Sequence, residues 1–145
     1  GAQAVQIFDT WAGLLTAAEY REWVLPRHQE IAQRVNRDQA PLILYINNGA
    51  HLLDASVESG VDVLSLDWRV DLADAAKRHG KRVALQGNMD PSVLAAPAEK
   101  IASMVRDLAR DAAPARGYIA NLGHGCLPGT PVEGVRAFTA AVQSL

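Results

Sequence analysis

The sequence of 145 residues has little cysteine, few aromatic residues and no excess of charge of one sign. Its one cysteine, Cys126, cannot form an internal disulfide or a cysteine-cluster zinc site. Aromatic residues make up 6% of the chain, and 14 basic and 16 acidic side chains leave a net charge of −2. This balance argues against nucleic-acid binding through a basic face.

Long apolar runs and targeting signals are lacking as well. No run approaches the roughly 18 consecutive apolar residues that a membrane helix needs. No basic and then apolar secretory signal opens the chain, which begins at Gly1 without an initiator methionine. We therefore expect a protein, or part of one, that works in the reducing cytoplasm without binding membranes or nucleic acids.

The sequence does contain short apolar runs that alternate with longer amphipathic segments. The short runs are rich in Val, Ile and Leu, as in parallel strands buried on both faces, and they occupy residues 4–8, 42–46, 61–66, 83–85 and 118–120. Two of the intervening segments carry apolar stripes at helical spacing: Ile101, Met104, Val105, Leu108 and Ala112, and Val132, Val135, Phe138, Thr139 and Val142. This order predicts an α/β fold built from parallel β/α units.

A third helical stripe and several capping residues agree with this pattern. The stripe is interrupted by Pro26, which should kink the helix, and consists of Tyr20, Trp23, Val24, Ile31 and Val35. Residues typical of helix starts and of left-handed helix ends follow the same plan: Thr16 with Glu19, Asp90 before Pro91, Gly60 and Gly80.

The predicted repeats fit either an open doubly wound sheet or a segment of a closed barrel. The glycine-rich phosphate turn of dinucleotide-binding folds is absent after the first strand, where Phe8-Asp9-Thr10-Trp11-Ala12-Gly13 stands instead. A (β/α)8 barrel needs about 250 residues, so this chain would supply just over half of one. We expect one continuous but incomplete unit, cut from a longer protein.

Reactive residues of parallel β/α folds lie at the carboxyl ends of the strands. In this sequence that edge collects carboxylates, amides, hydroxyls and histidines: Asp9, Thr10, Asn47, Asn48, His51, Asp67, Trp68, Arg69, Gln86, Asn88, Asp90, Asn121 and His124. The opposite edge carries solubilising charges, among them Arg37, Asp38, Lys81 and Arg82. This asymmetry favours an enzyme over a scaffold.

His124 is the strongest single candidate because Gly123 and Gly125 flank it and leave room for a ligand. In the alternative interpretation, the glycines serve a tight turn and His124 hydrogen-bonds a neighbouring loop. His51 fits structural packing better than ligand binding, whereas His28 and His79 are expected at the surface. His124 and Cys126 alone are too few ligands for zinc, so we predict no metal site.

The carboxylates allow two interpretations. Asp9, Asp67 and Asp90 could act as general acids or bases, but aspartates at strand-to-helix junctions more often cap a helix or orient a neighbour. Asp90, directly before Pro91, fits a cap best. Gln86 and Asn88 are expected to shape the floor of a pocket through their amides.

Four segments occur in an order found in a known family: Gln3-Ala4-Val5-Gln6-Ile7-Phe8-Asp9-Thr10-Trp11-Ala12-Gly13, Leu64-Ser65-Leu66-Asp67-Trp68-Arg69, Leu85-Gln86-Gly87-Asn88-Met89-Asp90-Pro91 and Ile119-Ala120-Asn121-Leu122-Gly123-His124-Gly125. Together they resemble the C-terminal part of the uroporphyrinogen decarboxylase family. The resemblance extends over essentially the whole chain. It implies that residues 1–145 are strands four to eight of a (β/α)8 barrel, the C-terminal portion of a single domain.

The resemblance also implies an activity and a set of site residues. The family removes the carboxyl groups of the four acetate side chains of uroporphyrinogen, giving coproporphyrinogen in haem biosynthesis, and it works as a homodimer without metal or organic cofactor. Substrate binding is implied for Phe8, for Thr10, where the family has serine, and for His124. His124 is also the implied catalytic residue.

Important parts of the family's site lie outside this sequence. Its substrate-binding arginines and the aspartate that contacts the pyrrole nitrogens belong to the N-terminal half, and neither Asp67 nor Asp90 is expected to replace that aspartate. Arg69 is the only arginine expected near the site. We therefore expect the isolated chain to be inactive and to associate, through its open sheet edges, with a second copy or the absent half.

Two alternatives remain at this point. One is a methyltransferase of the same superfamily that acts on corrinoids and thiols and uses zinc held by histidine and cysteine. The single cysteine, and Asn47-Asn48-Gly49 where a histidine and cysteine pair would stand, argue against it. The other alternative is a non-catalytic half-barrel.

Overall fold

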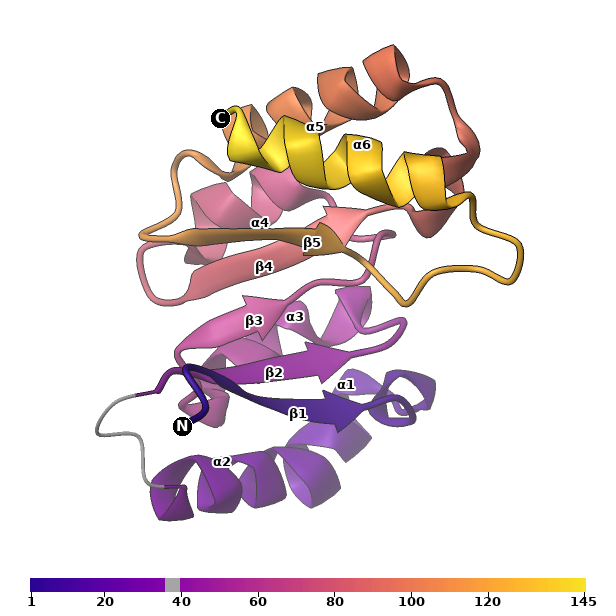
Figure 1. The fold of residues 1–145 in the computed structure, drawn as a ribbon. Helices are drawn as coiled ribbons and strands as arrows, with labels where there is room; N and C mark the ends of the chain where they lie inside the picture. Colours follow the sequence, from indigo (N-terminus) through magenta and orange to yellow (C-terminus); the bar gives the residue numbers. More distant parts are fainter. Residues whose placement is uncertain (36–39) are drawn as a thin grey trace.

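The computed structural model describes residues 1–35 and 40–145. Its strands form one parallel sheet in the order β1-β2-β3-β4-β5 (Figure 1). They are β1 (Val5–Asp9), β2 (Leu42–Ile46), β3 (Val63–Ser65), β4 (Ala84–Met89) and β5 (Tyr118–Leu122). All five predicted strands are confirmed. The sequential order excludes the doubly wound alternative, in which the strand order reverses within the sheet.

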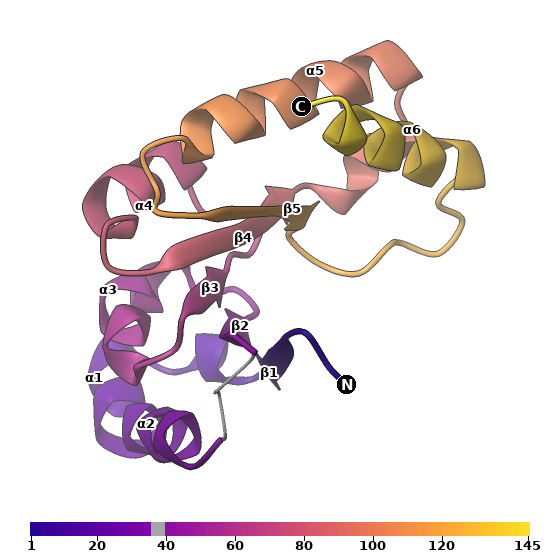
Figure 2. The ribbon, with the colours of Figure 1, turned by 60° about the vertical axis from the view of Figure 1, so that its left-hand side comes forward.

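Helices follow the strands and lie on one side of the sheet. They are α1 (Ala17–Glu19), α2 (Leu25–Arg34), α3 (Leu53–Ser56), α4 (Leu72–His79), α5 (Ala98–Ala112) and α6 (Val132–Gln143). Figure 2 shows α1 to α4 along one face, α5 and α6 beyond β4 and β5, and no helix of the described chain on the opposite face. Among the described residues, no helix is both long and apolar enough to cross a membrane.

The apolar core lies between the sheet and its helices. All residues of β2 and β3 are buried, whereas no residue of β1 or β5 is fully buried. A second, smaller core joins the end of β4 to α5 and α6 through Met89, Leu94, Ile101, Val105 and Ala141. Burial on both faces is therefore a property of the central strands and not of the two edge strands.

The sheet is strongly curved, with its helix-free face on the inside. Gln86 on β4 donates a hydrogen bond of 3.1 Å to Gln6 on β1, although three strand spacings would separate these strands by about 14 Å in a flat sheet. Likewise, the Tyr45 hydroxyl on β2 donates to the carbonyl of Gly123, just past β5, at 3.0 Å. Contacts of this kind require a concave inner face, as in an arc of a barrel.

The helix around Pro26 buries only part of the predicted stripe: Tyr20 is fully buried, and Val24 and Val35 pack against the core. A π-helical turn covers Tyr20–Val24, and the Leu25 amide bonds to the Tyr20 carbonyl, five residues back. Proline cannot donate the α-helical hydrogen bond, so the extra residue is accommodated just before it. The buried stripe therefore moves on by one residue, to Leu25, His28 and Ala32, and Trp23 and Ile31 are exposed.

Helix α6 follows the predicted stripe only in part: Phe138 and Val142 pack against the second core. Its buried residues are Gly134 and Ala141, whereas Val132 and Val135 are exposed and Thr139 is exposed as well. A Cβ on Gly134 would lie 1.8 Å from the Leu94 carbonyl oxygen. The small residues let α6 approach the backbone before α5, and this close approach decides which side faces inward.

Several local predictions can be compared with the structure. Thr16 and Glu19 form the expected capping box, Asp90 caps the turn that begins at Pro91, and Gly60 has a φ of 82°. Gly80 is not left-handed, with a φ of −58°. A Cβ there would lie 2.6 Å from the Ala115 Cα, so close packing explains this glycine.

Two histidines are placed differently from the prediction. His28 and His79 were expected at the surface, but both are buried. Each has a carboxylate partner that satisfies a ring nitrogen, Asp9 for His28 and Asp54 for His79. On the opposite edge, Lys81 and Arg82 are exposed as expected, and Arg37 and Asp38 lie outside the described residues.

Candidate functional site

A cavity of about 380 Å³ lies on the concave face, where the strands reach their carboxyl ends. It is lined by Gln6, Phe8, Thr10, Tyr45, Ser65, Asn121, Leu122, His124 and Gly125. The curvature of the sheet brings β1 and β5 to this common space, although they are its two edge strands. The three residues singled out in the sequence, Phe8, Thr10 and His124, all line it.

Phe8 and Tyr45 supply the aromatic side of the cavity. Their ring centroids are 6.0 Å apart in an edge-to-face arrangement. Phe8 is 70% exposed, which leaves most of a large apolar ring open to the cavity. An apolar or aromatic group bound there would cover this ring and be stabilised by the burial.

Thr10 is presented by a turn that Asp9 stabilises. One carboxylate oxygen of Asp9 accepts hydrogen bonds from the backbone amides of Trp11 at 3.2 Å and Ala12 at 2.8 Å. Among the described residues, no hydrogen-bond partner of the Thr10 hydroxyl is found. The hydroxyl is therefore free for a ligand, and Asp9 acts as an orienting group and not as an acid or base in the cavity.

Behind this turn, Asp9 belongs to a buried hydrogen-bonded chain with His28 and Tyr20. The Nε2 atom of His28 is 3.2 Å from Asp9 Oδ2, and its Nδ1 atom is 3.0 Å from the Tyr20 hydroxyl. Burial lowers the pKa of His28 despite the opposing effect of Asp9. Burial, followed by the charge of Asp9, raises the pKa of Tyr20. Neutral His28 fits both contacts by donating from Nε2 and accepting at Nδ1.

His124 lies at the other side of the cavity, directly after a well-anchored glycine. The Gly123 amide donates to the Met89 carbonyl at 2.8 Å, and its carbonyl accepts from Tyr45. The imidazole is flanked by the rings of Tyr45 and Trp68, at 6.5 and 5.7 Å between centroids. Within the described parts of the chain, neither ring nitrogen has a hydrogen-bond partner, so both are available to a ligand.

Asp67 and Arg69 hold the Trp68 ring in place. The Asp67 side chain is fully buried and accepts from the Asn48 amide at 3.0 Å and the Arg69 amide at 2.9 Å. It also forms an ion pair of 2.7 Å with the Arg69 guanidinium, which lies 3.7 Å from the centre of the Trp68 ring. Burial, followed by the charge of Asp67, raises the pKa of Tyr45 to about 12.

The remaining candidates divide into supporting and remote residues. Gln86 donates to Gln6 and Ser65, two residues of the cavity lining, so it holds the floor as expected. Asn88 instead donates to the carbonyls of Asp67 and Val70. His51 bonds to the Leu15 carbonyl at 2.8 Å, which agrees with a structural role.

Tyr45 was missed as a site residue because it lies within an uninterrupted apolar run. The signal that could have found it is chemical: a tyrosine inside such a strand needs a hydrogen-bond partner for its hydroxyl. Gln6 is a second missed residue, because it lies near the start of its strand and not at the carboxyl end.

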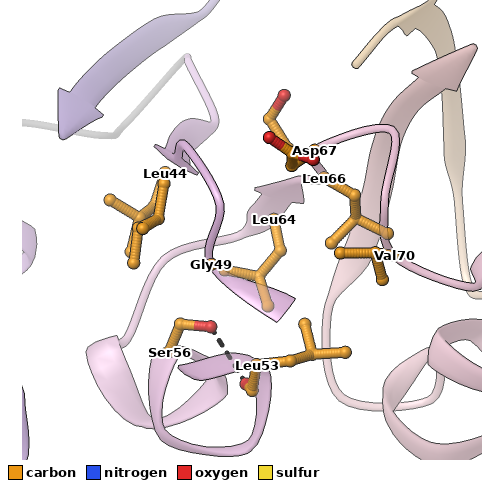
Figure 3. A pocket seen from close by; sticks show the side chains of 10 residues that line it. Leu44, Gly49, Leu53, Ser56, Leu64, Leu66, Asp67 and Val70 are labelled. Atoms are coloured by element: carbon orange, nitrogen blue, oxygen red, sulfur yellow. Dashed lines mark hydrogen bonds between the residues drawn. The ribbon is translucent and has the colours of Figure 1, made fainter. Parts of the chain in front are cut away.

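A second, very small cavity lies between β2, β3 and α3, on the helix side of the sheet (Figure 3). Its volume is about 20 Å³, and leucine side chains such as Leu44, Leu53 and Leu64 dominate its lining. That space fits one water molecule and not a ligand.

The described residues contain no group of three or more His, Cys, Asp or Glu side chains that could hold a metal ion. Cys126, two residues beyond His124, is exposed and not in a disulfide. The chemistry of the cavity is thus that of hydroxyls, amides, one imidazole and two aromatic rings.

Comparisons with known proteins give one family. The family model described as uroporphyrinogen decarboxylase (URO-D) matches residues 1–145. The chain is 50% identical to a uroporphyrinogen decarboxylase of Gloeobacter violaceus, over 100% of this chain and 42% of that protein. It is 46% identical to one of Synechocystis, over 95% of this chain and 40% of that protein.

A solved structure is similar as well. It is a methyltransferase from Methanosarcina mazei, with a TM-score of 0.84 and 25% sequence identity, and the match covers 99% of this chain and 42% of that one. The chain therefore spans about two-fifths of the length of the proteins that it matches.

Proposed function

Since this chain belongs to the uroporphyrinogen decarboxylase family, we propose that it forms the C-terminal part of an enzyme that converts uroporphyrinogen to coproporphyrinogen. The observation that carries this proposal is the meeting of Phe8, Thr10 and His124 at one cavity. Residues 1–145 would be strands four to eight of a single (β/α)8 barrel domain. The parallel order of the strands and the curvature of the sheet support this assignment.

The proposed reaction needs no metal or organic cofactor, because the substrate itself accepts the electrons. Protonation of a pyrrole ring carbon makes the ring an electron sink. The bond between the acetate methylene and its carboxyl group then breaks, CO₂ leaves, and the electron pair moves into the protonated ring. A proton added to the methylene carbon gives the methyl group, and loss of the first proton from the ring carbon restores the pyrrole. Each of the four steps therefore consumes one proton and releases one CO₂.

In this reaction the residues of the cavity bind and orient the macrocycle. The exposed ring of Phe8 packs against an apolar face of the substrate. The free hydroxyl of Thr10 and the free imidazole of His124 contact substrate carboxylates, and His124 is the catalytic residue that we assign. Threonine in place of the family's serine keeps the hydroxyl.

The cavity as described lacks the positive charge that this substrate requires. None of the residues found to line it is an arginine or a lysine, and the nearby Arg69 is already paired with Asp67. Uroporphyrinogen carries eight carboxyl groups, which arginine pairs well. We therefore expect the isolated chain to be inactive, with the missing charge supplied by the N-terminal part of the enzyme.

The exposed inner face and the two edge strands support association with another chain or chain segment. Val5 and Ile119, on the edge strands, are 40% and 39% exposed. The proposed assembly is a homodimer, and the proposed compartment is the cytoplasm, which suits an exposed free cysteine. Light scattering on the isolated chain tests the association, and a well-behaved monomer would contradict it.

A chimera tests the activity directly. In it, this chain replaces the matching segment of the Gloeobacter violaceus decarboxylase, to which it is 50% identical. We expect the folded chimera to release CO₂ from uroporphyrinogen, and we expect His124→Ala to slow turnover or weaken binding while leaving the fold intact. A folded chimera without turnover would refute the proposal, and unchanged kinetics for His124→Ala would return this histidine to a structural role.

The likeness to a methyltransferase supports a second candidate, a transferase that holds zinc. The 50% identity to a decarboxylase, against 25% to the methyltransferase, favours the first proposal. A zinc assay on the purified chimera and on the chain separates the two. Stoichiometric zinc would favour the transferase.

A further inference from the structure

The residue before His124 is held by two strands and by the segment that follows a third. Gly123 donates its amide hydrogen to Met89 of β4 and accepts the Tyr45 hydroxyl of β2. A Cβ on Gly123 would lie 2.3 Å from the backbone nitrogen of Trp68 and 2.7 Å from its Cα. Only glycine fits this approach, so the segment that follows β5 is held against the segment that follows β3.

The imidazole of His124 contacts the rings of Trp68 and Tyr45, the same two residues that lie against Gly123. The Trp68 ring is nearly perpendicular to it, at 84°, and the Tyr45 ring lies at 66°. Edge-to-face contacts at these distances favour one orientation of the imidazole. In the described chain the imidazole has no hydrogen bond of its own, so the two rings are what orients it.

Trp68 is in turn held in place on its other side. The Arg69 guanidinium lies over the indole, and the fully buried carboxylate of Asp67 holds the guanidinium. Tyr45 is held as well, because its hydroxyl bonds to Gly123 and its ring contacts Phe8. Both rings are therefore preorganised before a ligand binds.

We propose that Tyr45 and Trp68 are positioning residues that orient the His124 imidazole toward the cavity. The inference rests on the proposed function for the role of His124, but the orientation itself can be measured without turnover. Tyr45 acts through its ring and through the hydrogen bond to Gly123. Trp68 acts through its ring, which Asp67 and Arg69 hold.

Kinetics of the chimera test whether these residues act through His124. Tyr45→Phe removes the hydroxyl that bonds to Gly123 and lies 3.4 Å from the Asn47 side-chain oxygen, and it should lower kcat/KM about fivefold. Removing the indole, in Trp68→Leu, should lower it about tenfold, and Trp68→Phe should recover part of that loss. In a His124→Ala background, neither substitution should lower kcat/KM further, because the group they orient is gone. A merely structural role would lower kcat/KM equally in both backgrounds and would overturn the proposal.

Matched controls are present in the same chain. Tyr118→Phe removes another hydrogen bond from a tyrosine hydroxyl to a glycine carbonyl, that of Gly87. Trp23→Phe alters an exposed indole on another helix. Neither should change kcat/KM, and an equal loss in either control would argue against a specific role for Tyr45 or Trp68.

Histidine-labelled NMR provides a readout that does not depend on activity. The Hε1 signal of His124 should move in Trp68→Leu, which removes the indole ring current, and in Tyr45→Phe, which keeps the ring but frees it from Gly123, and it should stay in place in both controls. His51, which is bonded to the Leu15 carbonyl, reports that the fold is retained. An unmoved His124 signal in folded variants would refute the inference even if the chimera is active. A moved signal in a folded but inactive chimera would support it while the proposed function fails.

Discussion

Two aspartates at the carboxyl ends of their strands, Asp9 and Asp67, have different structural roles. Asp9 ends β1 and Asp67 follows β3, and each accepts two backbone amide hydrogens and pairs with one further side chain. The partner of Asp9 is His28, buried under the helix layer. The partner of Asp67 is Arg69, half-exposed and stacked on Trp68. The same carboxylate chemistry thus fixes a helix to the sheet in one region and supports the rim of the cavity in the other.

The largest effect is expected from Asp67→Ala. The substitution leaves two partly buried amides without an acceptor and Arg69 without its partner. We expect the free energy of unfolding to fall by about 3 kcal/mol, the lower end for a broken buried pair because Arg69 is half-exposed.

Urea unfolding measures this loss. Asp71→Ala is the control, because Asp71 is an exposed N-cap that accepts only the Asp74 amide, and caps contribute about 1 kcal/mol. Equal losses in the two variants would show that the burial of Asp67 adds nothing.

The Asp9 region should differ by its response to pH. Burial lowers the pKa of folded His28 below the usual 6.5, so the unfolded chain takes up this proton more readily. The contribution of His28 to stability is therefore complete above pH 6.5 and is lost as the pH falls below it.

Unfolding measured from pH 7.5 to 5 tests this expectation. His28→Gln should flatten the acid loss relative to the parent chain, whereas His51→Gln, at an exposed histidine, should not. Parallel curves for the parent and His28→Gln would show that His28 does not titrate between the two states in this way.

A smaller effect separates the two buried tyrosine hydroxyls. Tyr20→Phe removes the hydrogen bond to His28 and should lower the free energy of unfolding by about 1 kcal/mol. Since Tyr20 does not line the cavity, activity should be unchanged. Tyr45→Phe should instead reduce activity, and comparison of both variants in unfolding and turnover assays measures the contrast. A greater loss of turnover in Tyr20→Phe would contradict it.

The smallest effect is expected from Arg69→Lys. Lysine keeps the charge near Asp67 but loses the planar group that stacks on Trp68, so the loss should stay below about 1 kcal/mol. Thermal unfolding of Arg69→Lys and of Arg78→Lys provides the measurement. Arg78→Lys is the control, since Arg78 pairs with Asp54 and Asp74 and has no ring contact among the described residues. Equal shifts in the two variants would show that stacking contributes nothing.

Most of the fold was predictable because apolar runs and caps act locally. The five strands follow from short runs of Val, Ile and Leu, and the capping box at Thr16 follows from residue types three positions apart. Which residues of α2 face the core was not predictable, because the π turn before Pro26 moves every later residue onward by one position. The buried face of α6 was predicted only in part: Phe138 and Val142 pack against the core, but Gly134 and Ala141 pack closely because they are small, and an apolar pattern does not reveal this.

The site was predictable only in part for a related reason. Thr10 and His124 follow their strands, so strand order alone predicts that they share an edge, whereas Phe8 lies within β1 and was implied by the family resemblance. Tyr45 and the residue whose carbonyl it bonds, Gly123, are instead 78 positions apart in the sequence. Their burial and bonding depend on how far the sheet bends, which no local pattern encodes.

That bend is itself held by side chains. The hydrogen bond between the Gln6 and Gln86 side chains fixes the distance between the first and the fourth strand of the curved sheet. A segment that pairs with either edge strand therefore meets a sheet whose curvature is already fixed. Closure of the ring would then require only matching strands, and a flat sheet would be an unsuitable partner.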